Sequence, residues 1–172
     1  ARVRAMTTRA EYVAARERII RRALAEVGVR EASGHNNGVR VEEYIALGTK
    51  ATREPGLSWC AAFVLWCHRV EGVDIPGNDW AMRRVSTLYE EARQRDAILT
   101  ASEPPEPGDL AIYLGRASTH AGPSGHVQLV ISWHMRGTVD VVGGNEGNAV
   151  KRSTVAISAP TCYVRPERMF SA

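Results

Sequence analysis

Residues 103–114, EPPEPGDLAIYL, divide the chain into two parts of different character. The three prolines and the glycine between Glu103 and Asp109 exclude a helix there, because proline lacks the backbone donor that a helix needs. The run LAIYL that follows is rich in residues that favour strands. This stretch therefore predicts the point at which a helical half of the chain gives way to a sheet.

Downstream of this point the sequence has a period of two. HVQLVISW (126–133) and TVDVV (138–142) are predicted strands, and a fourth strand is expected in VAISA (155–159) or in TCYVRP (161–166). In the first of these, Val127 and Leu129 share one face and His126 and Gln128 the other. An antiparallel sheet is the expected arrangement.

Upstream, apolar residues recur at helical spacing. Four stretches show this pattern: 9–27, 39–48, 58–72 and 81–95. Gly48 is expected to stop the second helix, and Ser58 to be the N-cap of the third, SWCAAFVLWCHRVEG. Because that third helix is apolar on nearly all sides, it should be buried. Helices followed by an antiparallel sheet predict an α+β fold.

The composition is that of a globular protein. The chain has 172 residues, 44% hydrophobic and 24% charged, with a net charge of +3. We expect one domain over residues 1–172. No apolar run is long enough to span a bilayer, no stripe of basic and aromatic residues indicates nucleic-acid binding, and no metal-ligand spacing occurs. The sequence predicts no cofactor and no metal.

The three cysteines are Cys60, Cys67 and Cys162, too few for a disulfide framework. Cys60 and Cys67 would be about 10 Å apart on one helix, too far to bridge. A pairing of Cys162 with either remains open, although a free thiol with a chemical role is the simpler interpretation.

Cys60 falls in the first turn of the buried helix. Unpaired N–H groups and the helix dipole at that position favour an anion, which lowers the pKa of a thiol towards the reactive thiolate. The alternative is that Cys60 is a small core residue. The sheet favours the first interpretation, because His126 opens a strand and can reach a helix N-terminus packed nearby. Asn145, after the next strand, could orient the imidazole from behind.

Five segments together resemble the CHAP family of cysteine- and histidine-dependent amidohydrolases and peptidases. They are EVGVREASGHNNGVRVEEY (26–44), SWCAAFVLWC (58–67), PEPGDLAIY (105–113), SGHVQLVIS (124–132) and VVGGNEGNAV (141–150). They occur in the family's order over residues 23–155. The W-C-A-x-F-V segment and the succession P-G-D, H-V and G-G-N are the most specific parts.

The resemblance implies a papain-like fold, with N-terminal helices packed on a C-terminal antiparallel sheet. It also implies that Cys60 is the nucleophile, His126 the general base and Asn145 the orienting residue. Many relatives have a glutamate two positions before this asparagine, where the present chain has Gly143. Either a Cys-His-Asn triad operates or Glu146 takes part of that role, and the first is preferred because an amide can hold the imidazole tautomer.

Four further residues are candidates for a role at the site, and each has a structural role as its alternative. The backbone N–H of Cys60 would hold the oxyanion, and Asn37 and Tyr44 are candidates for the second donor. Asn37 would otherwise be a turn residue and Tyr44 a core aromatic. Trp59 and Trp80 are candidates to contact substrate, with a packing role as the alternative for each.

The expected function is therefore a cysteine hydrolase that cleaves amide bonds of bacterial peptidoglycan, as an endopeptidase or an N-acetylmuramoyl-L-alanine amidase. The alternatives are a catalytically inactive wall-binding module and a papain-like acyltransferase or amidase on another substrate. A monomer acting at the cell wall, in the periplasm or outside the cell, is expected. Phage lysin, autolysin and secreted antibacterial effector all remain open as its biological setting.

Overall fold

A computed structural model describes residues 7–49, 58–77, 81–115 and 125–171. The first half of the described chain is helical, as predicted. Its helices are α1 (Arg9–Ala25), α2 (Val39–Thr49), α3 (Cys60–Val70), the 3₁₀ turn η1 (Ala81–Arg83) and α4 (Val85–Gln94). Thr8 caps α1 through a capping box with Glu11, which satisfies backbone N–H groups of its first turn.

The second half forms an antiparallel sheet. Its strands are β1 (Leu110–Tyr113), β2 (His126–His134), β3 (Thr138–Gly143), β4 (Lys151–Ala156) and β5 (Cys162–Val164), and the 3₁₀ turn η2 (Pro166–Met169) follows. The strand order is β4-β3-β2-β1-β5. The predicted region 161–166 contains β5, at the edge beside β1, whereas β4, at the edge beside β3, shares only Val155 and Ala156 with the predicted region 155–159.

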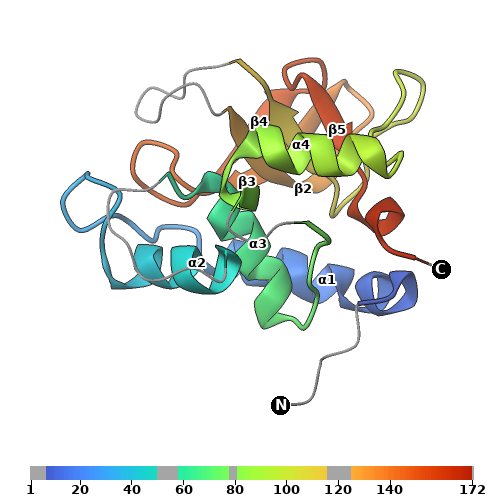
Figure 1. Cartoon of the computed structure of the whole chain (residues 1–172). Helices are drawn as coiled ribbons and strands as arrows, with labels where there is room; N and C mark the ends of the chain where they lie inside the picture. The colour runs from blue at the N-terminus through green and yellow to red at the C-terminus, as the bar shows by residue number, and fades with distance from the viewer. Residues whose placement is uncertain (1–6, 50–57, 78–80, 116–124, 172) are drawn as a thin grey trace, which may run out of the picture.

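The buried helix α3 lies at the centre of the fold. Figure 1 shows α1, α2 and α3 gathered on one side of the sheet. Every residue of α3 from Cys60 to His68 is buried, and the helix packs on α1, α2 and β2. The larger core joins these helices to Val127 and Leu129 of β2, whereas Val130 belongs to a smaller core that also contains Val139 and Val141.

Two predicted helix boundaries are corrected. Gly48 does not stop α2, which continues to Thr49; any side chain at Gly48 would collide with the backbone of Ala62 in α3. The glycine therefore permits close packing of two helices. The predicted helix 81–95 is interrupted at Arg84, whose extended backbone separates η1 from α4.

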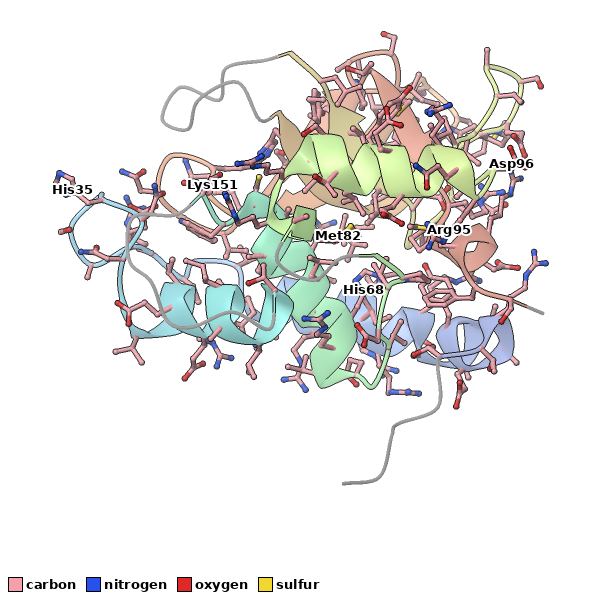
Figure 2. The ribbon with its side chains drawn as sticks, in the orientation of Figure 1. His35, His68, Met82, Arg95, Asp96 and Lys151 are labelled. Atoms are coloured by element: carbon pink, nitrogen blue, oxygen red, sulfur yellow. The ribbon has the colours of Figure 1, made fainter. Side chains whose placement is uncertain are left out.

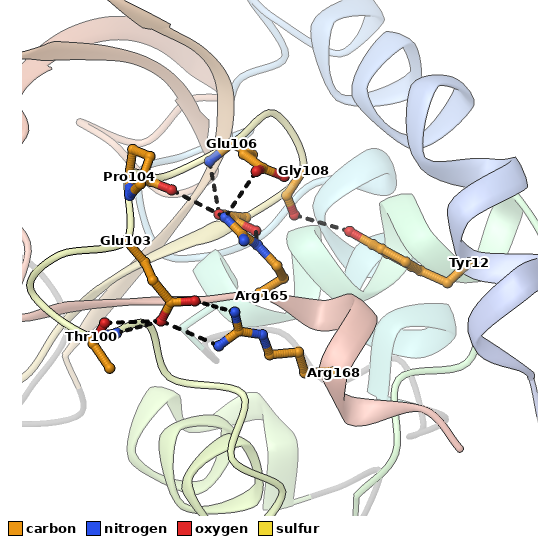
Figure 3. A network of polar contacts seen from close by, with 9 residues as sticks. Tyr12, Thr100, Glu103, Pro104, Glu106, Gly108, Arg165 and Arg168 are labelled. Atoms are coloured by element: carbon orange, nitrogen blue, oxygen red, sulfur yellow. Dashed lines mark hydrogen bonds and ion pairs between the residues drawn. The ribbon is translucent and has the colours of Figure 1, made fainter. Parts of the chain in front are cut away.

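The proline-rich loop is held by the C-terminal segment (Figure 3). Asp109, 3% exposed, accepts hydrogen bonds from Arg165 at 2.9 Å and from the backbone N–H of Glu106 at 2.8 Å. The hydroxyl of Tyr12 donates to the carbonyl of Gly108 at 3.2 Å, tying α1 to the same loop. These contacts fix the start of β1, and they give Asp109 a structural role.

The predicted α+β class with helices on an antiparallel sheet is confirmed. All three cysteines are free. Within the described ranges, no helix has the length and hydrophobicity needed to cross a membrane. One domain over residues 1–172 and a monomeric state stay predictions.

Candidate active site

The candidate nucleophile stands at the first position of α3. The N-cap of this helix is Trp59 and not, as predicted, Ser58, and Trp59 makes no side-chain capping bond. Ser58 Oγ lies instead 4.0 Å from Cys60 Sγ. The first turn of a helix carries backbone N–H groups without intrahelical partners, together with the positive end of the dipole. The local structure therefore favours a negative charge on the sulfur.

A glycine with an unusual backbone places the candidate base. Gly125 has φ +81°, and any side chain there would collide with the carbonyl oxygen of Tyr113. Gly125 therefore passes close to the backbone of Tyr113. The strand β2 begins at the next residue, His126, which lies directly opposite Tyr113 on β1. The two rings lie 6.0 Å apart between centroids. A residue with a side chain would be strained here, so Gly125 sets the position of the imidazole.

The imidazole of His126 links the thiol to a carboxylate. Its Nε2 lies 2.9 Å from Oε1 of Glu146, which leaves the second ring nitrogen to interact with Cys60, whose pKa His126 lowers. Only 15% of the His126 side chain and 17% of the Glu146 side chain is exposed. The electrostatic interactions among the three groups are therefore only weakly screened by solvent.

These contacts shift both proton equilibria. Burial raises the pKa of the Cys60 thiol, but the hydrogen bond and charge of His126, with help from Ser58 and the backbone of Val127, bring the pKa below its ordinary value. Burial lowers the pKa of His126, but Cys60 and Glu146 outweigh it and raise the pKa to about 9. The two shifts act in the direction of a thiolate–imidazolium pair.

The carboxylate beside His126 is that of Glu146, whereas the side chain of Asn145, the predicted orienting residue, makes a different contact. Asn145 has φ +59° and its Nδ2 donates to Oδ1 of Asn36 at 3.3 Å. Its side chain thus ties the loop after β3 to the loop before α2. The Oδ1 of Asn145 is buried and has no hydrogen-bond partner among the described residues.

Gly143 explains why the carboxylate can come from position 146. A side chain at Gly143 would collide with Oε1 of Glu146 and with Cγ of Gln128. The carboxylate of Glu146 therefore occupies the space beside the imidazole that a side chain at position 143 would enter. The glycine at position 143, where many relatives have glutamate, thus leaves room for the carboxylate of Glu146 beside the imidazole.

Two further side chains at the site were not predicted. Gln128 Nε2 donates to Oε1 of Glu146 at 2.5 Å, and Tyr113 Oη donates to Oε1 of Gln128 at 2.9 Å. The sequence did contain a signal for Gln128, since alternation along β2 places it on the same face as His126. The link to Tyr113 depends on the register between β1 and β2, which sequence alone does not give.

The remaining candidates lie elsewhere. Asn37 accepts hydrogen bonds from the backbone and hydroxyl of Ser33, as a turn residue does. Tyr44 is buried and donates to Glu26 at 2.5 Å. Trp59 is 0% exposed and its Nε1 donates to Glu31 at 2.8 Å, so it belongs to the core and not to a substrate surface. Trp80 lies outside the described residues.

The other described histidines have structural surroundings. His35 hydrogen-bonds to Ser33 in the loop before α2, and His68 is buried on α3 (Figure 2). His134 Nε2 lies 3.3 Å from Asp140 at the end of β2. Among the residues that the structure describes, no cluster of three or more His, Cys, Asp or Glu side chains could hold a metal ion.

Comparison with known proteins places these features in context. The family profile described as the CHAP domain matches residues 52–145, a range that includes both Cys60 and His126. No curated protein sequence matches the chain.

Solved structures with the same fold include those of three proteins. The peptidoglycan hydrolase RipB of Mycobacterium tuberculosis is 23% identical, with a TM-score of 0.53 over 93% of this chain and 68% of that one. The P60 domain of an M. avium paratuberculosis antigen is 16% identical, with a TM-score of 0.52 over 91% of this chain and 96% of that one. The resuscitation promoting factor interacting protein RipA, mutated at a histidine, is 19% identical, with a TM-score of 0.52 over 92% of this chain and 65% of that one. These similarities confirm the papain-like α+β fold.

Proposed function

Because the chain belongs to the CHAP family, we propose that it is a cysteine hydrolase that cleaves amide bonds of bacterial peptidoglycan. The observation that carries this proposal is the contact of His126 with both Cys60 and Glu146, which lowers the pKa of the thiol and raises that of the imidazole to about 9. A thiolate at a helix N-terminus with an imidazolium beside it is the arrangement that nucleophilic attack on an amide requires.

The reaction proceeds in two halves. The Cys60 thiolate adds to the amide carbonyl, the carbon–nitrogen bond breaks, and the imidazolium of His126 protonates the departing amine, leaving a thioester on Cys60. A water molecule then transfers a proton to His126 as it attacks the thioester, which releases the carboxylic acid and restores the thiolate–imidazolium pair. The N–H of Cys60 at the start of α3 stabilises the oxyanion in both halves.

We assign the orienting role to Glu146. Its Oε1 accepts from Nε2 of His126 and so directs Nδ1 to the sulfur. Three of the similar structures are RipA proteins mutated at a histidine, a cysteine and a glutamate. These are the residue types that meet here in His126, Cys60 and Glu146, which supports the assignment.

The substrate class follows from the family and from the similar folds, RipB among them a peptidoglycan hydrolase by name. The bond that is cut is either within the stem peptide or at the junction of glycan and peptide. The site of action is accordingly the bacterial cell wall.

Digestion of purified sacculi tests the proposal. The wild-type protein should release soluble fragments with new amino termini, and Cys60→Ser should release none, because a serine hydroxyl is not ionised by this imidazole. Cys162→Ser, on β5, is the matched control and should retain activity. Binding of sacculi without release by the wild-type protein would indicate a wall-binding module. Fragments joined to an added amine, with no hydrolysed product even when water is the only acceptor, would indicate an acyltransferase. Either result would contradict the proposal.

A further inference from the structure

Gln128 and Tyr113 form a chain of hydrogen bonds that ends on the carboxylate facing His126. Oε1 of Glu146 accepts from Nε2 of Gln128 at 2.5 Å and lies 2.9 Å from Nε2 of His126. Oε1 of Gln128 in turn accepts from the hydroxyl of Tyr113 at 2.9 Å. One carboxylate oxygen is thus shared between the imidazole and a neutral amide.

The Tyr113 hydroxyl fixes which way the amide of Gln128 points. A hydroxyl that donates to the amide oxygen leaves the NH₂ group facing Glu146, where it can only donate. Both residues are 5% exposed, so bulk water competes little for these groups. The orientation is therefore favoured by a hydrogen bond between two paired strands.

Glu146 needs such a support because it comes from a loop. It stands between Asn145 and Gly147, which have φ +59° and +57°. The imidazole stands at the start of a strand, in register with Tyr113. Gln128, two residues further along the same strand as His126, connects the loop carboxylate to the sheet that carries the imidazole.

We propose that Gln128, oriented by Tyr113, is a positioning residue that holds Glu146 against His126. This inference rests on the proposed Cys60–His126–Glu146 chemistry and adds two residues to it. Without the amide, the carboxylate is free to leave the imidazole, and the imidazolium loses a partner that stabilises its charge. The Cys60 thiolate then forms only at higher pH.

Titration of the thiolate absorbance, taken as the difference from Cys60→Ser, tests this without any substrate. Gln128→Met keeps the length of the side chain and removes the donor, so its titration should shift to higher pH, in the same direction as that of Glu146→Gln. On sacculi its kcat should fall roughly 10- to 100-fold with KM nearly unchanged, as expected for a misplaced catalytic group. A Gln128→Met titration that matches the wild type would overturn the inference. If wild type fails to digest sacculi while the shift occurs, the proposed function fails and the inference stands.

A double-mutant cycle tests the role of Tyr113. Tyr113→Phe should lower kcat by less than Gln128→Met and should have no further effect in the Gln128→Met background, because it acts through that amide. Additive losses would overturn the chain. The control is Tyr163→Phe, on neighbouring β5, whose hydroxyl donates to the carbonyl of Ile157; it should leave kcat unchanged. If circular dichroism shows that Gln128→Met does not fold, Gln128→Leu, which also removes the donor, is measured in its place. Wild-type kcat and titration in that variant contradict the inference.

Discussion

The carboxylate of Glu146 occupies the space into which a side chain at Gly143 would project. Both positions lie at the end of β3 and in the loop after it, so either could supply a carboxylate to His126, but not both at once. The chain uses position 146, from a loop whose residues Asn145, Gly147 and Asn148 all have positive φ. This relationship leads to the first prediction.

Moving the carboxylate should rescue a damaged site. Glu146→Ala should lower kcat by about 10²- to 10⁴-fold, the range expected when acid–base catalysis is disrupted. Adding Gly143→Glu to that variant should restore part of the loss, because the collision with Oε1 of Glu146 is then removed and only the side-chain atom Cγ of Gln128 has to shift to admit a carboxylate near the imidazole. Gly143→Glu alone should be inactive or unstable, since the two side chains collide. Turnover of sacculi by the three variants checks this, and a double variant no better than Glu146→Ala would contradict it.

Activity should have a bell-shaped dependence on pH. The pKa of Cys60 lies below its ordinary value, so kcat/KM should rise as pH passes through it and the thiolate forms. The pKa of His126 is raised to about 9, so activity should be lost as pH rises through about 9 and the imidazolium loses its proton.

Glu146→Gln should move this alkaline limb to lower pH, because the carboxylate contributes to the raised pKa of His126. The initial rate on a soluble muropeptide, measured from pH 5 to 10, gives both limbs. An alkaline limb that is the same in both proteins would contradict the contact with Glu146.

A methyl group at Gly125 should disable the site, whereas one at Gly137 should not. Both glycines have positive φ, +81° and +82°, and so share a backbone strain of about 1–3 kcal/mol on substitution. Only at Gly125 does the added atom meet the carbonyl of Tyr113, next to His126; at Gly137 nothing lies within 4 Å. Gly125→Ala should therefore lose far more activity and stability than Gly137→Ala, measured by urea unfolding and by turnover. Equal losses would show that the close approach does not position the imidazole.

Stability should fall in mild acid because of His68. This side chain is 0% exposed, and burial lowers its pKa to about 4 from about 6.5. In that window the unfolded chain binds the proton and the folded chain does not, so the free energy of unfolding decreases as pH falls from about 6.5 to about 4. The full effect is about 3 kcal/mol.

His68→Leu should remove this part of the pH dependence, as seen by urea unfolding at pH 4.5 and 7. The exposed His35, replaced in the same way, is the control for the loss of a solvent-facing histidine. A wild-type slope retained in His68→Leu would assign the effect to other groups.

The sequence predicted what depends on repeating patterns. Helical spacing placed Cys60 near the start of a buried helix, and alternation placed His126 at the start of a strand. The choice between Asn145 and Glu146 could not be made in this way. Side-chain directions in the loop 144–148 depend on individual residues with positive φ, and they do not repeat with a regular period. The burial of Trp59 could not be predicted either, because it depends on contacts with Tyr44 and Glu31, which come from other segments. The sequence near Gly48 predicted a helix end, because it contains no sign that the backbone of α3 packs against this glycine.

The covalent intermediate tests the central claim most directly. A soluble muropeptide is mixed with the wild-type protein, the reaction is quenched with acid during turnover, and the protein is mapped by mass spectrometry. The account predicts the acyl half of the substrate attached as a thioester to the peptide that contains Cys60, and no such adduct in His126→Ala. Product release with Cys60 never modified, or undiminished turnover by Cys60→Ser, would contradict it.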